Sequence, residues 1–509
     1  MFESTAWTLF PPLLVIVLAV VTKEVYSSLL AGIFAGALLV AGFDPVKTLQ
    51  VAVVDGISAS AAALAGNLLF LVLMGMLASI LGKAGGIAAF GRWAETHIAS
   101  RLGAQMSTFC LGLLLFIDDY FNCLTVGTTM RPVTDGRRIS RAKLAYLIDA
   151  TAAPICIIAP VSTWSAAVSG VAESLGTGVA GLALFIQTIP YNFYSLLTIV
   201  FVFCLICMDA DFGKMRAAEE KARLTGDLGA AEAGEENAPS FCESPRAVVG
   251  DLLFPLIALS VSCVFFMLYV GGFYGATPWC GAENAGDLAA AFGATDTVIA
   301  LPCGASVALL LTCLYFSLRR TIGFREMANS LPQGLCAMAP GIVLLVLAMT
   351  LKTVTAKLGT AAYVQGVIVG VSSEIYVTLP AVLFLVSVML SFATGTSYGT
   401  FGVMLPIAAA VFPADSTLLI VGLSACLSGA VCGDHCSPIS DTTVMASMGA
   451  RVNHLEHVAT QLPYAVPVAA VSFGMYLLAG FWQNWAVCLG VGSALLIVFL
   501  FLVSRRQNP

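Results

Sequence analysis

Long apolar runs separated by short polar segments dominate this chain. Hydrophobic residues make up 59% of its 509 positions and charged residues only 10%, whereas a soluble domain carries roughly 25% charged residues. A helix of about 20 apolar residues crosses the hydrocarbon core of a bilayer. We therefore predict an all-α polytopic membrane protein whose main partner is the lipid bilayer. The expected spans lie at residues 7–22, 25–42, 67–82, 105–131, 143–160, 178–208, 247–270, 296–318, 335–351, 376–391, 400–432, 461–482 and 484–503.

One hydrophilic stretch, residues 209–246, divides the chain. It mixes basic residues with an acidic, alanine-rich run, which is typical of a solvated connector that is partly helical and partly flexible. We predict an N-terminal transmembrane repeat at 1–208, a cytoplasmic linker at 209–246 and a C-terminal transmembrane repeat at 247–509. The amphipathic segments 84–101 and 319–333 are expected at the membrane interface.

The distribution of basic residues predicts the orientation. Lys and Arg are enriched in cytoplasmic loops, and here they gather in a few places. The segment 271–295 contains neither residue and is predicted to be external. No basic tract favours nucleic acid as a partner. The residues predicted to face the cytoplasm are Arg131, Arg137, Arg138, Arg141, Lys143, Arg319, Arg320, Arg325, Arg505 and Arg506.

Two stretches on either side of the linker resemble each other. Residues 116–132 and 392–406 each contain a Phe, a cluster of small polar groups, Thr-x-Gly and then Met-x-Pro. A five-cation loop follows the first, whereas residues 407–416 after the second contain no cation. The positive-inside rule therefore places the equivalent loops on opposite sides of the membrane. This pattern predicts two inverted-topology repeats with broken helices and a site near the midplane.

The adjacent carboxylates Asp118 and Asp119 end an apolar run. Two such groups in a low-dielectric site cannot both ionise cheaply, so one must bind a proton or a cation. On a helix, Asn122 and Thr125 would add amide and hydroxyl oxygens, which suit a hard cation such as sodium. The alternative is a pair that caps a helix end. Asp149 is likewise a coupling carboxylate or an N-cap near the surface.

The segment 432–443 places two carboxylates, a histidine and several hydroxyls in apolar surroundings. Intramembrane ionisable groups are costly and normally functional. Pro438 makes local unwinding as plausible as a continuous helix. His435 either carries a proton or donates to a backbone carbonyl, and His454 and His457 are expected at the interface.

A second hydroxyl-rich break, at residues 394–402, carries no charge. It either exposes backbone groups for a cation or an anionic substrate, or packs helices closely through small residues. The predicted cation or proton ligands are Asp118, Asp119, Asn122, Thr125, Asp149, Asp434, His435, Ser437 and Asp441, with sodium at Asp118, Asp119, Asp434 and Asp441. The predicted substrate or backbone-break residues are Thr128, Thr151, Thr394, Thr396, Ser397, Thr400, Ser440 and Thr442.

These motifs resemble the NhaC-type sodium/proton antiporter family of the ion-transporter superfamily. The resemblance rests on residues 117–122, 141–149, 433–443 and 454–463 and reaches both halves of the chain. It implies an elevator-type transporter with re-entrant hairpins, resembling dicarboxylate/sodium symporters. It also implies a homodimer in the bacterial inner membrane.

Two functions are compatible with these residues. The first is secondary active exchange of external protons for internal sodium or lithium. The second is sodium-coupled movement of a small organic solute, an amino acid or a carboxylate, at the same cation site. We expect no cofactor and no enzymatic activity, because Gly433–Asp434 lacks the neighbouring glycine that an intramembrane aspartyl protease would need.

Overall fold

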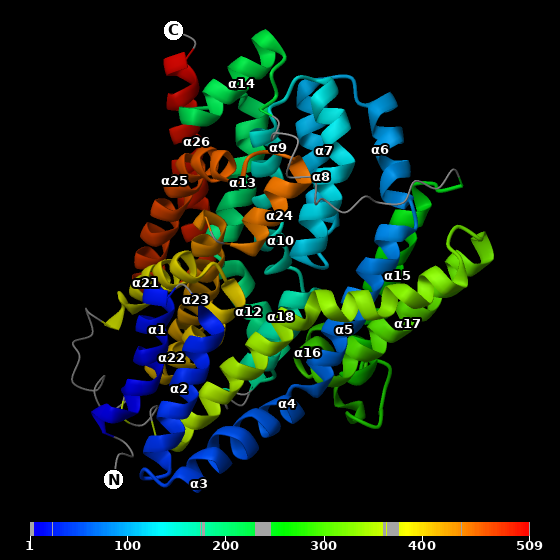
Figure 1. Cartoon of the computed structure of the whole chain (residues 1–509). Coiled ribbons are helices and arrows are strands. Elements are labelled where there is room, and N and C mark those ends of the chain that lie inside the picture. The colour runs from blue at the N-terminus through cyan, green and yellow to red at the C-terminus, as the bar shows by residue number, and fades with distance from the viewer. Residues whose placement is uncertain are drawn as a thin grey trace.

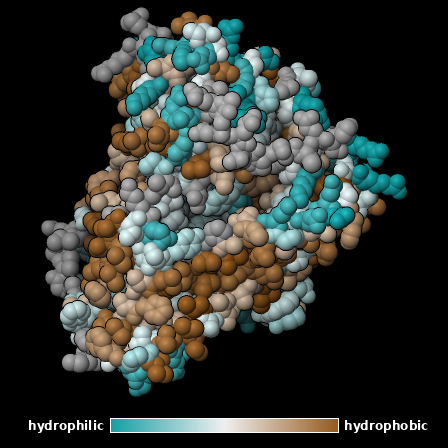
Figure 2. All heavy atoms as spheres, viewed as in Figure 1, coloured by the Kyte–Doolittle hydropathy of each residue, from teal (hydrophilic) through white to brown (hydrophobic). Residues whose placement is uncertain are grey.

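The computed structural model describes residues 5–22, 24–173, 175, 179–229, 246–359, 363, 376–438 and 440–507, all in helices, turns and loops without strands. Within this part, seven helices are long and apolar enough to cross a membrane. The predicted all-α membrane class is therefore confirmed. Apolar side chains are exposed along three helices, α15 (Gly250–Val270), α17 (Thr297–Arg319) and α26 (Trp485–Gln507). Figure 2 shows hydrophobic residues, in brown, over much of the lower body. Such a surface suits contact with lipid.

The first half contains fourteen described α-helices and shorter helical turns (Figure 1). Their bounds are η1 Ala6–Leu9, α1 Phe10–Thr22, α2 Val25–Val40, α3 Pro45–Leu49, the π-helix η2 Gln50–Ser58, α4 Ala59–Ala63, α5 Ala65–Lys83, α6 Gly86–His97, α7 Arg101–Leu114, α8 Asp119–Gly136, α9 Arg141–Asp149, α10 Ala153–Cys156, α11 Thr163–Glu173, α12 Gly181–Thr188, η3 Ile189–Tyr191, α13 Phe193–Met208 and α14 Gly213–Thr225.

The second half has the same helical character. Its bounds are α15 Gly250–Val270, η4 Ala282–Asn284, α16 Leu288–Gly293, α17 Thr297–Arg319, α18 Phe324–Lys357, α21 Leu379–Thr394, α22 Ser397–Val411, α23 Thr417–Cys436, α24 Asp441–Ala450, α25 His454–Phe481 and α26 Trp485–Gln507. Helices α15, α17 and α18 pack with α5, while α21, α23, α25 and α26 pack with one another and with α13.

Four predicted spans differ from the observed helices. Residues 105–131 are two helices, α7 and α8, because the chain breaks at 115–118. Residues 143–160 and 400–432 are also interrupted, and 178–208 comprises α12 and α13. Conversely, the predicted interfacial segment 319–333 is largely the first part of α18, which continues without interruption to Lys357. Apolar content alone does not reveal where a buried helix is interrupted.

Equivalent helices of the two halves run in opposite directions. Helix α8 ends where Arg131, Arg137 and Arg138 gather, and we call this the basic end of the molecule. There Arg131 donates to the carbonyl of Gly449 at the end of α24 (3.4 Å). Helix α25 begins near that end and runs away from it (Figure 1). Near its far end, the Tyr476 hydroxyl donates to the Ser424 carbonyl in the first part of α23 (3.1 Å). Helix α22, which ends just before α23 begins, therefore runs opposite to α8.

The linker is more ordered than predicted where the structure describes it. Helix α14 packs against α9 and α25, and Glu219 on α14 is buried. Its carboxylate accepts from the Ser140 backbone N–H (2.7 Å) and pairs with Arg101. Nearby, the buried Lys143 pairs with Asp211. Helix α14 is the helical part expected of the linker, and its buried face is anchored to the transmembrane helices. Residues 230–245 lie outside the described part.

A close contact between two glycines joins the two halves. Helix α8 contacts α24, and a Cβ atom on Gly127 would lie 2.6 Å from the Cα of Gly449. Only a residue without a side chain permits this approach without backbone movement. The C-terminal part of the second half is thereby held against the hairpin of the first half.

Candidate functional site

Each half presents a hairpin tip in which a polar side chain caps the second helix. In the α7–α8 hairpin, Asp118 accepts from the Phe121 backbone N–H (2.9 Å). In the α21–α22 hairpin, Thr396 accepts from the Gly399 backbone N–H (3.3 Å). Both are N-caps that satisfy a third-position amide, so the equivalence predicted for the two stretches extends to local geometry. The Asp118 carboxylate, one of the predicted ion ligands, is therefore also the N-cap of α8.

The first tip lies against the break that precedes α11. The Thr163 backbone N–H donates to the Ile117 carbonyl (2.9 Å), and the Thr163 hydroxyl donates to Oδ2 of Asp118 (3.3 Å). Oδ2 of Asp119 accepts from the indole Nε1 of Trp164 (3.1 Å). Both carboxylates are 3% exposed. Asp119 therefore receives one side-chain donor in a buried environment.

The second tip lies against the break between α23 and α24 in the same manner. The Ser397 hydroxyl donates to Oδ2 of Asp434 (2.9 Å), and the Ser437 hydroxyl donates to the Phe392 carbonyl (2.8 Å). Asp434 is 4% exposed. Each half thus joins a hairpin tip to a helix break and buries a carboxylate where they meet.

The two half-sites adjoin. The Tyr398 ring on α22 lies edge-to-face against Trp164 on α11, with centroids 5.0 Å apart. Asp119 and Asp434, one in each half-site, are both buried. Buried like charges favour uptake of a proton or a cation. Lys143, the buried lysine of the first half, is paired with Asp211 instead.

Asn122 and Thr125 occupy different roles in the structure. The Asn122 amide nitrogen donates to the carbonyls of Gly112 (2.8 Å), Leu115 (3.1 Å) and Thr151 (3.2 Å) and so fixes the broken segments. Its Oδ1 atom and the Thr125 hydroxyl are buried without a partner among the described residues. These two oxygens remain available to a ligand.

Most of the predicted threonine ligands bond to their own helices. Their hydroxyls donate to carbonyls four residues earlier, which uses the single donor hydrogen and leaves the oxygen lone pairs able to accept or to bind a cation. These residues are Thr128, Thr151, Thr394 and Thr400. Ser440 caps α24 through the Thr443 backbone N–H (3.4 Å) and hydrogen-bonds Thr442 (3.0 Å). The side chain of Asp441 lies outside the described part.

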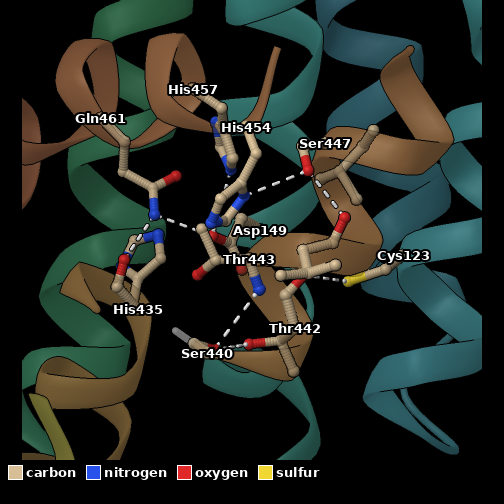
Figure 3. A network of polar contacts seen from close by, with 12 residues as sticks. Cys123, Asp149, His435, Ser440, Thr442, Thr443, Ser447, His454, His457 and Gln461 are labelled. Atoms are coloured by element: carbon tan, nitrogen blue, oxygen red, sulfur yellow. Dashed lines mark hydrogen bonds and ion pairs between the residues drawn. The ribbon is translucent and has the colours of Figure 1, made fainter. Parts of the chain in front are cut away.

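A second polar cluster surrounds Asp149 (Figure 3). Its Oδ2 atom accepts from Nε2 of His457 (3.3 Å) and from Nε2 of Gln461 (2.7 Å), both on α25. His457, which was expected at the interface, is buried within the protein, with 0% of the residue exposed. His454 reaches inward as well, with Nε2 2.6 Å from the Pro438 carbonyl.

Sequence reasoning missed the partners that come from distant segments. His457, Gln461, Trp164 and Tyr398 all contact or adjoin a predicted carboxylate. One signal was present for two of them, because a four-residue spacing puts His457 and Gln461 on one helix face. Nothing in the local sequence indicates that Trp164 meets Asp119.

One known protein family matches much of this chain. A model of the Na+/H+ antiporter family matches residues 155–481, and an uncharacterized protein of Haemophilus influenzae is 35% identical over 99% of this chain and 96% of its own. The chain belongs to the Na+/H+ antiporter family. The predicted family resemblance is therefore confirmed, and the chain is a transporter.

Shorter and more distant likenesses agree with this family. A malate-2H+/Na+-lactate antiporter of Bacillus subtilis is 38% identical over 103 residues, 20% of this chain and 22% of that protein. The Alcanivorax borkumensis YdaH transporter shares the fold, with a TM-score of 0.54, 13% identity and coverage of 85% and 88% of the two chains. Neisseria gonorrhoeae MtrF gives a TM-score of 0.53, 13% identity and coverage of 87% and 85%.

Proposed function

We propose that this antiporter-family protein exchanges sodium or lithium for protons across the bacterial inner membrane, as a secondary active transporter. The observation that carries the proposal is a pair of buried carboxylates, Asp119 and Asp434, one in each of two half-sites that adjoin through the Trp164–Tyr398 contact. Carboxylates in such surroundings are stable only when a proton or a cation neutralises them. One site that accepts either ion, but not both, is the physical requirement for exchange.

The donor set favours a small hard cation. Among the described residues, no three His, Cys, Asp or Glu side chains converge closely enough to hold a metal ion alone. A sodium ion here would combine a carboxylate with neutral oxygens, for which Asn122 Oδ1 and the Thr125 hydroxyl are candidates. Sodium and the proton are the cargo in this scheme, and no cofactor takes part. A homodimer working by an elevator-type movement is proposed with it on the family resemblance.

The second candidate function is sodium-coupled exchange or uptake of a small organic solute. It is favoured by the likeness to the Bacillus subtilis malate-2H+/Na+-lactate antiporter. The N-terminus of α22, capped by Thr396 and without an acidic residue in its first turn, would attract a carboxylate group through its backbone N–H groups.

The test uses purified protein in liposomes that contain a pH-sensitive dye. Under an imposed proton gradient, sodium is added alone and then with amino acids or organic acids. Proton movement driven by sodium alone, and lost in Asp119→Asn and Asp434→Asn, is the expected result. His97→Gln, on the exposed surface of α6, is the matched control. Movement only when an organic acid or amino acid is present would replace the first function with the second.

A further inference from the structure

The contact between Asp149 and α25 forms a buried acid–histidine pair away from the hairpin tips. Asp149 is the last residue of α9, and its carboxylate is 2% exposed; the His457 side chain is 0% exposed. The distance from His457 Nε2 to Asp149 Oδ2 is 3.3 Å. A buried carboxylate of this kind requires a positive or hydrogen-bonded partner from the protein.

The geometry identifies the exchangeable proton of this pair. Because Nε2 of His457 faces a carboxylate, that nitrogen is assigned the hydrogen of the donor. Nδ1 is buried and has no hydrogen-bond partner in the described part of the chain. Adding a proton at Nδ1 turns the pair from a single negative charge into a neutral ion pair. The pair therefore has the charge change of a site that binds one proton.

Among the described residues, no lysine or arginine forms an ion pair with Asp149. On its own helix, Lys143 is paired with Asp211, and at the basic end Arg101 is paired with Glu219 of α14. The sequence of α21 contains no titratable residue, and the side chain of Asp441 on α24 lies outside the described part. The other titratable groups that face the pair are Cys123 of α8, Tyr146 of α9, Tyr194 of α13, His435 of α23 and His454 of α25.

Gln461 connects this pair to the helix that carries Asp434. Its Nε2 atom donates both to Asp149 Oδ2 (2.7 Å) and to the backbone carbonyl of His435. Asp434 is the preceding residue and belongs to the second hairpin site. A change in the charge of the Asp149–His457 pair therefore acts on the Gln461 amide, which also holds the C-terminal end of α23. This arrangement gives a physical route between the two sites.

We propose that Asp149 and His457 form a second proton-carrying position, which is protonated when the hairpin tips hold a proton and deprotonated when they hold the cation. Gln461 is the positioning residue between them. The inference rests on the proposed exchange function and adds to it, because it predicts that more protons move per sodium than the hairpin site alone can carry.

The first experiment measures the proton-to-sodium ratio in proteoliposomes whose membrane potential is clamped at zero. For a pH difference of one unit, the sodium gradient at which net flux stops is determined for the wild type, His457→Gln and the control His97→Gln. Loss of one carried proton lowers that gradient about tenfold, because one pH unit is worth about 1.4 kcal/mol per proton. Gln461→Leu is expected to give an intermediate ratio. An unchanged ratio in a folded His457→Gln protein overturns the proposal.

The second experiment follows the histidines directly and does not depend on transport. The chain has 4 histidines, so ¹⁵N-histidine-labelled protein in liposomes gives few NMR signals. The His457 signal is the one that is lost in His457→Gln and in His457→Asn. The expected result is a His457 signal that titrates within the working pH range and shifts in Asp149→Asn. A signal that stays constant refutes the second site even if exchange is intact. Absence of any sodium-driven proton movement in the wild type instead refutes the proposed function.

Discussion

The two adjacent aspartates are predicted to fail in different ways. Asp118 caps α8 and accepts from Thr163 (3.3 Å), whereas among the described residues Asp119 accepts one side-chain hydrogen bond, from Trp164 (3.1 Å). Asp118 is therefore primarily a residue of structural support, and Asp119 carries the charge in the proposed exchange. Substitution of each by Asn and by Ala separates the two roles.

The magnitudes follow from the contacts. Loss of an N-cap costs about 0.5–2 kcal/mol, and loss of a charged hydrogen bond costs about 1.5–3 kcal/mol. We expect Asp118→Ala to lower the free energy of unfolding by about 2–5 kcal/mol. Asp118→Asn should cost less than about 1 kcal/mol, because Asn caps a helix as well as Asp. Asp119→Asn should change stability little, because an amide oxygen can still accept from Trp164.

The assay pairs unfolding in mixed detergent micelles with proton flux in liposomes. Asp119→Asn should abolish sodium-driven flux in a folded protein, and Asp118→Asn should retain part of it. If both Asn variants lose flux equally, or if Asp119→Ala destabilises the protein more than Asp118→Ala, the division of roles is refuted.

Two further predictions concern the basic end and the orientation. Lys143→Met leaves the Asp211 carboxylate buried beside the Tyr464 hydroxyl (2.5 Å) and should cost about 3–5 kcal/mol in the same unfolding assay. Adding Asp211→Asn should recover much of that loss; no recovery would contradict the ion-pair explanation. Arg138→Cys and Asp415→Cys lie at exposed positions after α8 and α22. In a background lacking exposed native cysteines, an impermeant thiol reagent should reach only Arg138→Cys from the cytoplasm and only Asp415→Cys from outside. Labelling of both from one side would refute opposite orientations of the halves.

Much of the architecture was predictable because it depends on patterns of short range. Apolar runs predicted the membrane class, and the likeness of 116–132 to 392–406 predicted two hairpins whose second helices run in opposite directions. The start of each second helix was predictable in kind, since Asp118 and Thr396 are good N-caps. Interruptions inside apolar runs were harder, because small apolar residues suit both a helix and a turn buried in protein.

The site was predictable only as far as its charged members. Carboxylates stand out in an apolar sequence, so Asp118, Asp119, Asp149 and Asp434 were identifiable. Their partners were not, because residues such as Trp164 and Gln461 are ordinary members of apolar helices until the chain folds. His457 was placed at the interface because its neighbours are polar, yet the tertiary packing of α25 against α9 buries it.

The packing of α24 against α8 also constrains how the protein is made. The Cys123 thiol on α8 contacts the carbonyl of Thr442 on α24, 319 residues later in the chain. At roughly 5–20 residues per second, a ribosome needs roughly a quarter of a minute to a minute to synthesise that interval. Throughout this time the first hairpin and its two aspartates are in the membrane without their partner helix. A truncated chain that stops before α24 therefore leaves this face of α8 without its partner, and biogenesis must protect an unfinished polar surface until the final helices are inserted.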